Sequence, residues 1–199
     1  MTRLGNRANR TCTSGFSTVE LVIAVAVILI ISGVALPSFL RSYRTYQLTD
    51  ASTKIANLLK LTRFEAIRRN TPVNFRLQAV ANGTNLWADS LPPINNGVMD
   101  RGEPQVVFTG TVVPIASGAA PGAGALAAAV NVPAIAYLSP AAATVTFDQR
   151  GATNPPAVSA LFVGNTAVPG LGSRAVVLLP SGSVQVWSAD TTGTWHLLN

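Results

Sequence analysis

The sequence predicts an α+β fold, in which one long N-terminal helix packs on a globular domain built from an antiparallel β-sheet. Three observations predict this class. Residues 21–40 carry no charge and are long enough for a membrane-spanning helix. A helical repeat of apolar residues continues to residue 69, and strand-like alternation begins at residue 73. We therefore expect a leader over 1–15, an apolar helix over 16–40, its amphipathic continuation over 41–70 and a β-rich domain over 71–199.

The leader is basic. Arg3, Arg7 and Arg10 lie in it without any acid, and the whole chain has a formal net charge of +6. From Phe16 onward eleven basic residues face eight acidic ones, a balance of +3. Cys12 is the single cysteine of the chain, so a chain cut near residue 15 has no disulfide and no thiol nucleophile. Its stability must then come from packing.

The apolar segment is predicted to be a helix that the mature chain retains. At 1.5 Å per residue, twenty residues make a helix of ~30 Å, which is the thickness of a hydrocarbon core. A secretory signal has a shorter apolar run followed by a cleavage site, whereas this run continues directly into more helical pattern. Pro37 removes one helical hydrogen bond, so a kink is expected there. Basic residues flank both ends of the segment, so charge alone does not set its orientation.

Glu20 is the one acid at the head of this segment, and two interpretations of it stay open. Residues 17–20 read STVE, which fits a capping box that satisfies backbone N–H groups in the first helical turn. A charge within lipid costs ~2.5–3.5 kcal/mol at a helix centre, and less near the helix end. The second interpretation is therefore that the Glu20 carboxylate pairs with a positive charge.

The start of the helix carries a family resemblance. Residues 15–21 read GFSTVEL, follow a short basic leader and precede an unbroken apolar run with Pro37 at its far end. This arrangement is similar to the class III signal of type IV pilins and type II secretion pseudopilins. The resemblance implies that a prepilin peptidase cuts between Gly15 and Phe16 and methylates the new N-terminus at Phe16. It also implies that Glu20 pairs with the N-terminal amine of a neighbouring subunit during filament assembly.

The second half of the helix is predicted to be amphipathic. Asp50 and Lys54, and Glu65 and Arg69, are spaced for ion pairs at i,i+4. Asn70, followed by Thr-Pro, is a signal for the end of the helix. The apolar face has residues at steps of three or four: Leu48, Ala51, Ile55, Leu58, Leu59, Thr62 and Ala66. The opposite face is basic, with Arg44, Lys54, Lys60, Arg63 and Arg68.

Strand patterns occupy most of the chain after the helix. The strands are predicted at 73–79, 105–113, 143–148, 158–163, 174–179 and 183–188. The last two flank Pro180-Ser181-Gly182 and are expected to form a hairpin. Between them and the first strands lies an Ala/Gly-rich excursion at about 114–142, in which ten of the 21 residues 116–136 are alanine. We expect a surface excursion whose degree of order the sequence leaves open, with a short helix at 123–130 as one form it can take.

A narrower resemblance follows from three stretches of this domain. The segments LLKLTRFEAIRRNTPV (58–73), TVTFDQRG (144–151) and RAVVLLPSGSVQVW (174–187) are similar in order and spacing to the GspH/FimT family of minor pseudopilins and minor pilins. The resemblance implies a pilin-like fold and a structural subunit at or near the tip of a type IV pilus or type II secretion pseudopilus, where it aids assembly. It implies a single-pass inner-membrane protein with a periplasmic globular domain, which later enters the filament. Its expected partners are other pilins or pseudopilins through the N-terminal helix, prepilin peptidase, an inner-membrane assembly platform and, before assembly, membrane lipid.

The alternative function is that of a DNA-binding minor pilin acting in DNA uptake. In FimT-type members this activity is associated with a Gly-Arg-x-Arg hairpin near the C-terminus. The aligned stretch here is GSVQ, formed by Gly182, Ser183, Val184 and Gln185, so both arginines are missing. Other arginines of the domain are scattered in sequence: Arg76, Arg101, Arg150 and Arg174. The loss of phosphate contacts disfavours DNA binding.

The sequence contains few residues that could serve in catalysis or bind a metal. His196 is the only histidine and lies near the C-terminus, and the segment Gly122-Ala123-Gly124 follows no predicted strand that would make it a nucleotide-binding loop. Asn96, Gly97 and Glu103 match three positions of a calcium loop, but Pro92 and Ile94 stand at two earlier ligand positions without a side-chain oxygen. We therefore expect a protein that is not an enzyme and that uses no cofactor and no metal.

Overall fold

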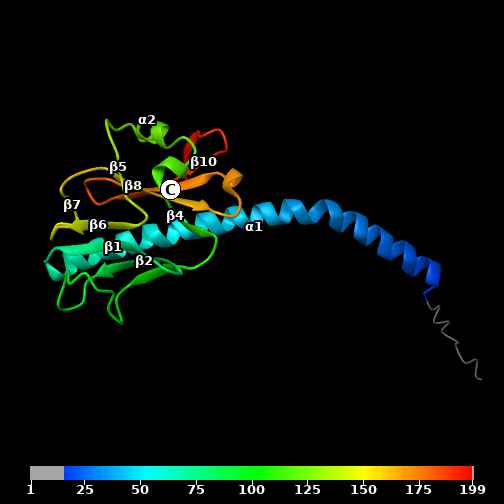
Figure 1. Ribbon diagram of the computed structural model, residues 1–199, viewed down its shortest axis with the longest axis horizontal. Helices are drawn as coiled ribbons and strands as arrows, with labels where there is room; N and C mark the ends of the chain where they lie inside the picture. Colours follow the sequence, from blue (N-terminus) through cyan, green and yellow to red (C-terminus); the bar gives the residue numbers. More distant parts are fainter. Residues whose placement is uncertain (1–15, 199) are drawn as a thin grey trace, which may run out of the picture. The chain divides into compact units, whose positions relative to one another are not determined.

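The computed structural model describes residues 16–198, so the predicted leader, with Cys12 and Gly15, lies outside the described residues (Figure 1). The chain divides into two compact units, Met1–Leu40 and Arg41–Asn199. Helix α1 (Thr18–Arg69) starts in the first unit and ends in the second, with the bounds predicted from the sequence. Asn70 has a left-handed backbone with φ of 50°, and the Thr71 N–H donates to the Ala66 carbonyl. This local geometry ends the helix where the Asn-Thr-Pro signal predicted.

The strands of the second unit form two sheets within the described residues. The first sheet has the order β3-β2-β1-β6-β7, with β1 (Val73–Val80), β2 (Gly83–Asp89), β3 (Gln105–Phe108), β6 (Ala142–Phe147) and β7 (Thr153–Asn154). The second has the order β11-β10-β9-β8-β4, with β4 (Val112–Ile115), β8 (Ser159–Asn165), β9 (Ser173–Leu178), β10 (Val184–Ala189) and β11 (Trp195–Leu197). Both ladders are antiparallel, and β5 (Ala136–Tyr137) adds one parallel pairing to β8.

The second half of α1 packs against both sheets (Figure 1). The predicted apolar face of the helix is confirmed, since every residue expected on it is buried. Phe75 and Phe147 from the first sheet and Leu161 and Val176 from the second join the same hydrophobic core. The α+β class is therefore confirmed, although the expectation of one sheet was wrong: two separate sheets share the helix as their common core element.

The expected ion pairs along α1 are present. Lys54 Nζ lies 2.7 Å from Asp50 Oδ2, and Arg69 Nε lies 2.8 Å from Glu65 Oε2. Arg68 also donates to the Glu65 carboxylate, and this hydrogen bond is the main cause that lowers the pKa of Glu65. On the predicted basic face, the Nε of Arg63 is buried without an acceptor among the described residues.

Five of the six predicted strands match a strand of the structure, and the sixth was drawn too long. The segment 105–113 is interrupted at residues 109–111, so β3 and β4 belong to different sheets. Strand β2 was not predicted, although it pairs with β1 through a tight turn in which Val80 faces Gly83. The short strands β5 and β7 were also not predicted.

The Ala-rich segment, whose degree of order the sequence left open, is ordered and covers the outer face of the second sheet. It contains the 3-10 turns η1 (Ser117–Ala119) and η2 (Ala123–Ala125) and the short helix α2 (Leu126–Val130). The short helix that the sequence allowed at 123–130 is therefore present. Leu126 is fully buried against Phe162 and Val177 in a second hydrophobic core. Strands β8 and β9 are consequently buried on both faces, which explains their continuous apolar runs.

Aromatic side chains fix the Ala-rich segment to this sheet. The Trp195 indole N–H donates to the Gly122 carbonyl at 2.7 Å, and the Tyr137 hydroxyl donates to the Ala123 carbonyl at 2.9 Å. Both rings pack on Phe162, with ring centroids 5.8 Å and 5.4 Å away. Alanine and glycine allow the backbone to approach the sheet closely, while the aromatic residues supply the buried area.

The predicted hairpin between β9 and β10 is confirmed, and its turn meets a second turn over α1. Gly182 has a left-handed backbone with φ of 77°, and its N–H donates to the Leu179 carbonyl. A Cβ at this position would collide with the Gly151 carbonyl oxygen and would lie 2.9 Å from Arg63 Nε. Glycine is therefore required here by backbone conformation and by close contact.

We predict that Gly182→Ala destabilises the second unit by about 2–4 kcal/mol, because alanine adds left-handed strain and displaces the turn around Gly151. Urea unfolding of a fragment covering 41–199 measures the effect. Gly118→Ala is the matched control, since its Cβ meets no atom within 4 Å and its effect should stay below about 1 kcal/mol. Equal effects of the two substitutions would contradict the contact argument.

Candidate functional site

The first turn of α1 is capped by Ser17 alone. The Val19 N–H donates to the Ser17 hydroxyl oxygen at 3.3 Å, and the Leu21 N–H donates to the Ser17 carbonyl at 3.1 Å. A full capping box would also have the Glu20 carboxylate accept the Ser17 N–H. Glu20 does not form this hydrogen bond. Of the two capping-box residues predicted from the sequence, only Ser17 therefore caps the helix.

Glu20 is exposed in the first turn of α1. Within residues 16–198 its carboxylate forms no hydrogen bond and no ion pair. Phe16 precedes the helix and is 79% exposed. The predicted cleavage position between Gly15 and Phe16 lies at the edge of the described residues, so the processing of Gly15 and Phe16 stays a prediction.

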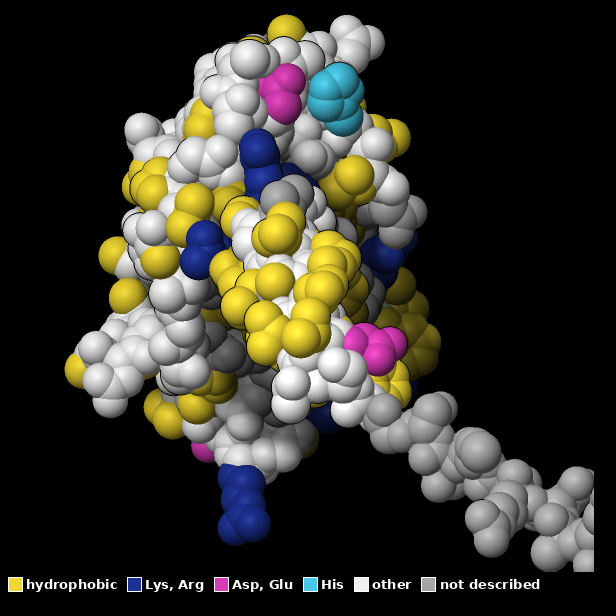
Figure 2. Space-filling view, turned by 90° about the vertical axis from the view of Figure 1, so that its right-hand side faces the viewer, with side chains coloured by type: hydrophobic (Ala, Val, Ile, Leu, Met, Phe, Trp, Pro, Cys, Tyr) yellow, Lys and Arg dark blue, Asp and Glu magenta, His cyan; other side chains and the backbone are white. Residues whose placement is uncertain are grey.

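The first unit presents an uncovered apolar helix surface. Leaving Val34 aside, its large side chains from Leu21 to Leu40 are exposed, with Ile30 for example at 70%. Figure 2 shows hydrophobic side chains covering this segment. By length and composition α1 is suited to cross a membrane, since its most apolar window has a mean hydropathy of 2.8 and no part of that window is buried. This is the only such helix within the described residues.

Pro37 lies inside α1, and the helix continues on both sides of it. A proline at this depth removes one backbone N–H from the helical ladder. The kink that the sequence predicts at Pro37 stays a prediction.

The residues that suggested a calcium loop have structural partners within the protein. The buried Glu103 carboxylate accepts hydrogen bonds from the N–H groups of Ser90, Leu91 and Asp100. The Asn96 side chain donates to the Asp100 carboxylate at 2.7 Å. No cluster of acidic, histidine or cysteine side chains suited to a metal occurs among the described residues. The loop is therefore organised by carboxylates that accept backbone N–H groups.

The remaining candidate residues do not converge on one site. His196 is exposed on β11 opposite Ser188, and the Gly122–Gly124 segment packs under Trp195. Two of the scattered arginines are used internally: Arg76 pairs with Asp89, and Arg174 is 94% buried. Burial lowers the pKa of Arg174, whose Nε lies 3.4 Å from the Thr49 hydroxyl.

The GSVQ hairpin occupies the predicted turn after β9, and Arg101 and Arg150 are exposed elsewhere on the unit. Neither guanidinium forms a hydrogen bond or an ion pair among the described residues, although the Arg150 backbone N–H donates to Asp148 Oδ1 at 2.8 Å. These positions do not assemble the paired arginines that a Gly-Arg-x-Arg hairpin would supply. The argument against DNA binding rests on the sequence, and the function itself stays a prediction.

Comparison with known proteins places the domain in a family. The family model described as type II transport protein GspH matches residues 51–182, about two thirds of the chain. Two solved structures of the type IV minor pilin FimU from Pseudomonas aeruginosa also match. They are 14% and 15% identical, cover 77% and 76% of this chain and 90% and 93% of their own chains, and give TM-scores of 0.37 and 0.34. No curated protein sequence matches.

The matched range runs from the buried face of α1 to the turn of the β9–β10 hairpin. It includes the three stretches whose order and spacing resemble the GspH/FimT group, apart from residues 183–187 of the third. The chain belongs to the GspH family of type II transport proteins.

Proposed function

We propose that this protein is a minor pilin or pseudopilin, a structural subunit built into a type IV pilus or a type II secretion pseudopilus at or near its tip. One observation carries the proposal: a GspH-family domain continues from an uncovered apolar helix whose first turn contains a single acid without a described partner. The role is structural, and the subunit aids assembly through this helix.

The apolar surface requires a non-aqueous environment. Each Leu, Ile or Val side chain that is left exposed costs about 1.5–3 kcal/mol relative to burial, so the segment 21–40 in water would cost on the order of tens of kcal/mol. Lipid satisfies this requirement before assembly, with the helix crossing the inner membrane and the globular domain in the periplasm. Apolar helices of neighbouring pilins satisfy it in the filament.

Glu20 fits a specific role in this assembly. Its carboxylate is not needed to cap α1, because Ser17 caps the first turn. Cleavage between Gly15 and Phe16 by a prepilin peptidase, followed by methylation of Phe16, would create an N-terminal amine on every subunit. An amine from a neighbouring subunit then supplies the positive charge that a carboxylate requires in an apolar filament core. The assembly platform in the inner membrane is the expected partner for this step.

The first prediction concerns processing. Gly15→Val should prevent cleavage, because a branched side chain at the cut obstructs the protease cleft, and only the full-length chain should accumulate. Mass spectrometry of the membrane-extracted protein gives the N-terminus directly. A wild-type chain that begins anywhere other than Phe16 would contradict the assignment.

The second prediction concerns the charge of Glu20. Glu20→Gln should be produced, inserted and cleaved normally but depleted from purified filaments, because the buried amine of a neighbour loses its counter-ion at a cost of about 3–5 kcal/mol. Quantitative immunoblotting of the filament and membrane fractions measures this depletion.

Glu65→Gln is the matched control for Glu20→Gln, since Glu65 lies on the same helix but already pairs with Arg68 and Arg69. It should enter filaments at wild-type levels. Wild-type incorporation of Glu20→Gln would leave Glu20 without an assembly role.

The third prediction separates a structural subunit from a DNA-binding one. A fragment covering 41–199 should fold, since it has its own hydrophobic core, and should bind duplex DNA only weakly at physiological salt. Fluorescence anisotropy at several salt concentrations tests this. Sub-micromolar affinity with a steep salt dependence would instead favour the DNA-uptake function.

A further inference from the structure

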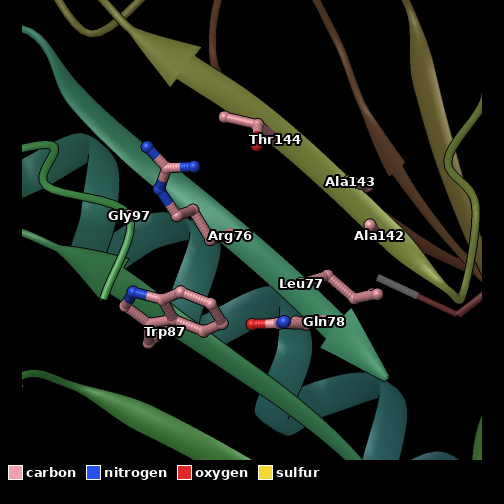
Figure 3. A pocket seen from close by; sticks show the side chains of 8 residues that line it. All are labelled: Arg76, Leu77, Gln78, Trp87, Gly97, Ala142, Ala143 and Thr144. Atoms are coloured by element: carbon pink, nitrogen blue, oxygen red, sulfur yellow. The ribbon is translucent and has the colours of Figure 1, made fainter. Parts of the chain in front are cut away.

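A shallow cavity of about 240 Å³ lies on the face of the first sheet that points away from α1. Figure 3 shows how three neighbouring strands build it, with Arg76 and Gln78 from β1, Trp87 from β2 and Thr144 from β6. In the strand register, Arg76 stands opposite both Trp87 and Thr144. Gly97, from the loop after β2, closes one side. The cavity is unrelated to the helix surface used for assembly.

Arg76 is held in a fixed orientation at this cavity. Its Nε donates to Asp89 Oδ2 at 2.7 Å, and the fully buried Asp89 carboxylate also accepts the N–H groups of Asn96 and Gly97. The other end of the guanidinium has only one long contact, from Nη2 to the Asn95 carbonyl at 3.5 Å. Because the Arg76 side chain is 24% exposed, its terminal N–H groups remain available to an acceptor.

The other polar groups of the cavity also lack partners. Among the described residues, the Thr144 hydroxyl and the Gln78 amide form no hydrogen bond, and both residues are exposed. The Trp87 side chain forms a wall that is 97% buried, and its indole N–H has no acceptor among the described residues. No carboxylate other than the fully engaged Asp89 lies beside Arg76.

We propose that this cavity binds a carboxylate. A planar guanidinium edge flanked by hydroxyl and amide donors matches the two oxygens of a carboxylate. Asp89 already offsets the charge of Arg76, so a singly charged group suits the cavity better than phosphate, which carries −1.5 to −2. A sugar would require an open aromatic face, and the Trp87 ring is covered. The volume accommodates a carboxylate with a few carbon atoms, whether it belongs to a free metabolite or to an acidic side chain of another protein.

The three tryptophans provide a direct test on the full-length chain in detergent micelles. Trp187 and Trp195 already donate to Gln185 and Gly122, whereas Trp87 has no acceptor. Addition of glutarate, or of the peptide acetyl-Gly-Glu-Gly-amide, should therefore shift only the Trp87 indole signal in ¹⁵N–¹H spectra, and Trp87→Phe assigns that signal by removing it. Binding of both compounds supports a carboxylate site open to either source. Binding of the peptide alone supports a carboxylate carried by a protein.

Thr144→Val should weaken glutarate or peptide binding about fivefold, the value of one lost hydrogen bond. Thr144→Ser is the matched control, because it keeps the hydroxyl at this position of the cavity and should bind both compounds as the wild type does. The proposal is overturned if the Trp87 signal moves with neither compound, if sodium chloride at equal ionic strength moves it equally, or if phosphate binds more tightly than glutarate. A contact between the Trp87 indole proton and bound water, with no shift on either addition, would also overturn it.

Discussion

The buried face of α1 between Leu48 and Ala66 is the constraint on which the second unit depends. Side chains from both sheets pack on this face, and neither sheet has another helix of comparable length among the described residues. The second sheet acquires a second core only because the Ala-rich segment covers its outer face. The unit is therefore layered. Helix α1 packs between the two sheets, and the Ala-rich segment packs on the outer face of the second sheet.

The same helix meets opposite requirements along its length. Before Leu40 its large apolar side chains are exposed, and after Leu48 its apolar face is buried while ion pairs such as Asp50–Lys54 hold the solvated side. Charge follows this division, because Glu20 is the single charged residue between Phe16 and Leu40. In the role proposed for Glu20 its counter-charge comes from another subunit, whereas charges of the second half of α1 pair within the second unit.

Sequence patterns predicted the features that depend on local periodicity and missed those that depend on register and tertiary contact. The bounds of α1, its buried face and the β9–β10 hairpin follow from spacing and from turn residues, and all are confirmed. Strand β2 was not predicted because GTNLWAD has little alternation. The order of the Ala-rich segment was left open because it depends on tertiary contacts with Phe162 and Trp195. The cavity beside Arg76 could not be predicted, since strand register alone brings Trp87 and Thr144 to it. The roles predicted for Gly15, Phe16, Glu20 and Pro37 rest on the sequence motif alone.

The burial of α1 between two sheets also has a mechanical consequence. Tension applied along the helix axis would load both interfaces in shear at the same time, so many side-chain contacts must yield together. A helix resting on a single sheet could instead be peeled away a few contacts at a time. The turns around Gly151 and Gly182, which close over Arg63 near the end of α1, add a steric stop against sliding. We therefore expect the two sheets to stay packed on α1 when tension acts along the helix.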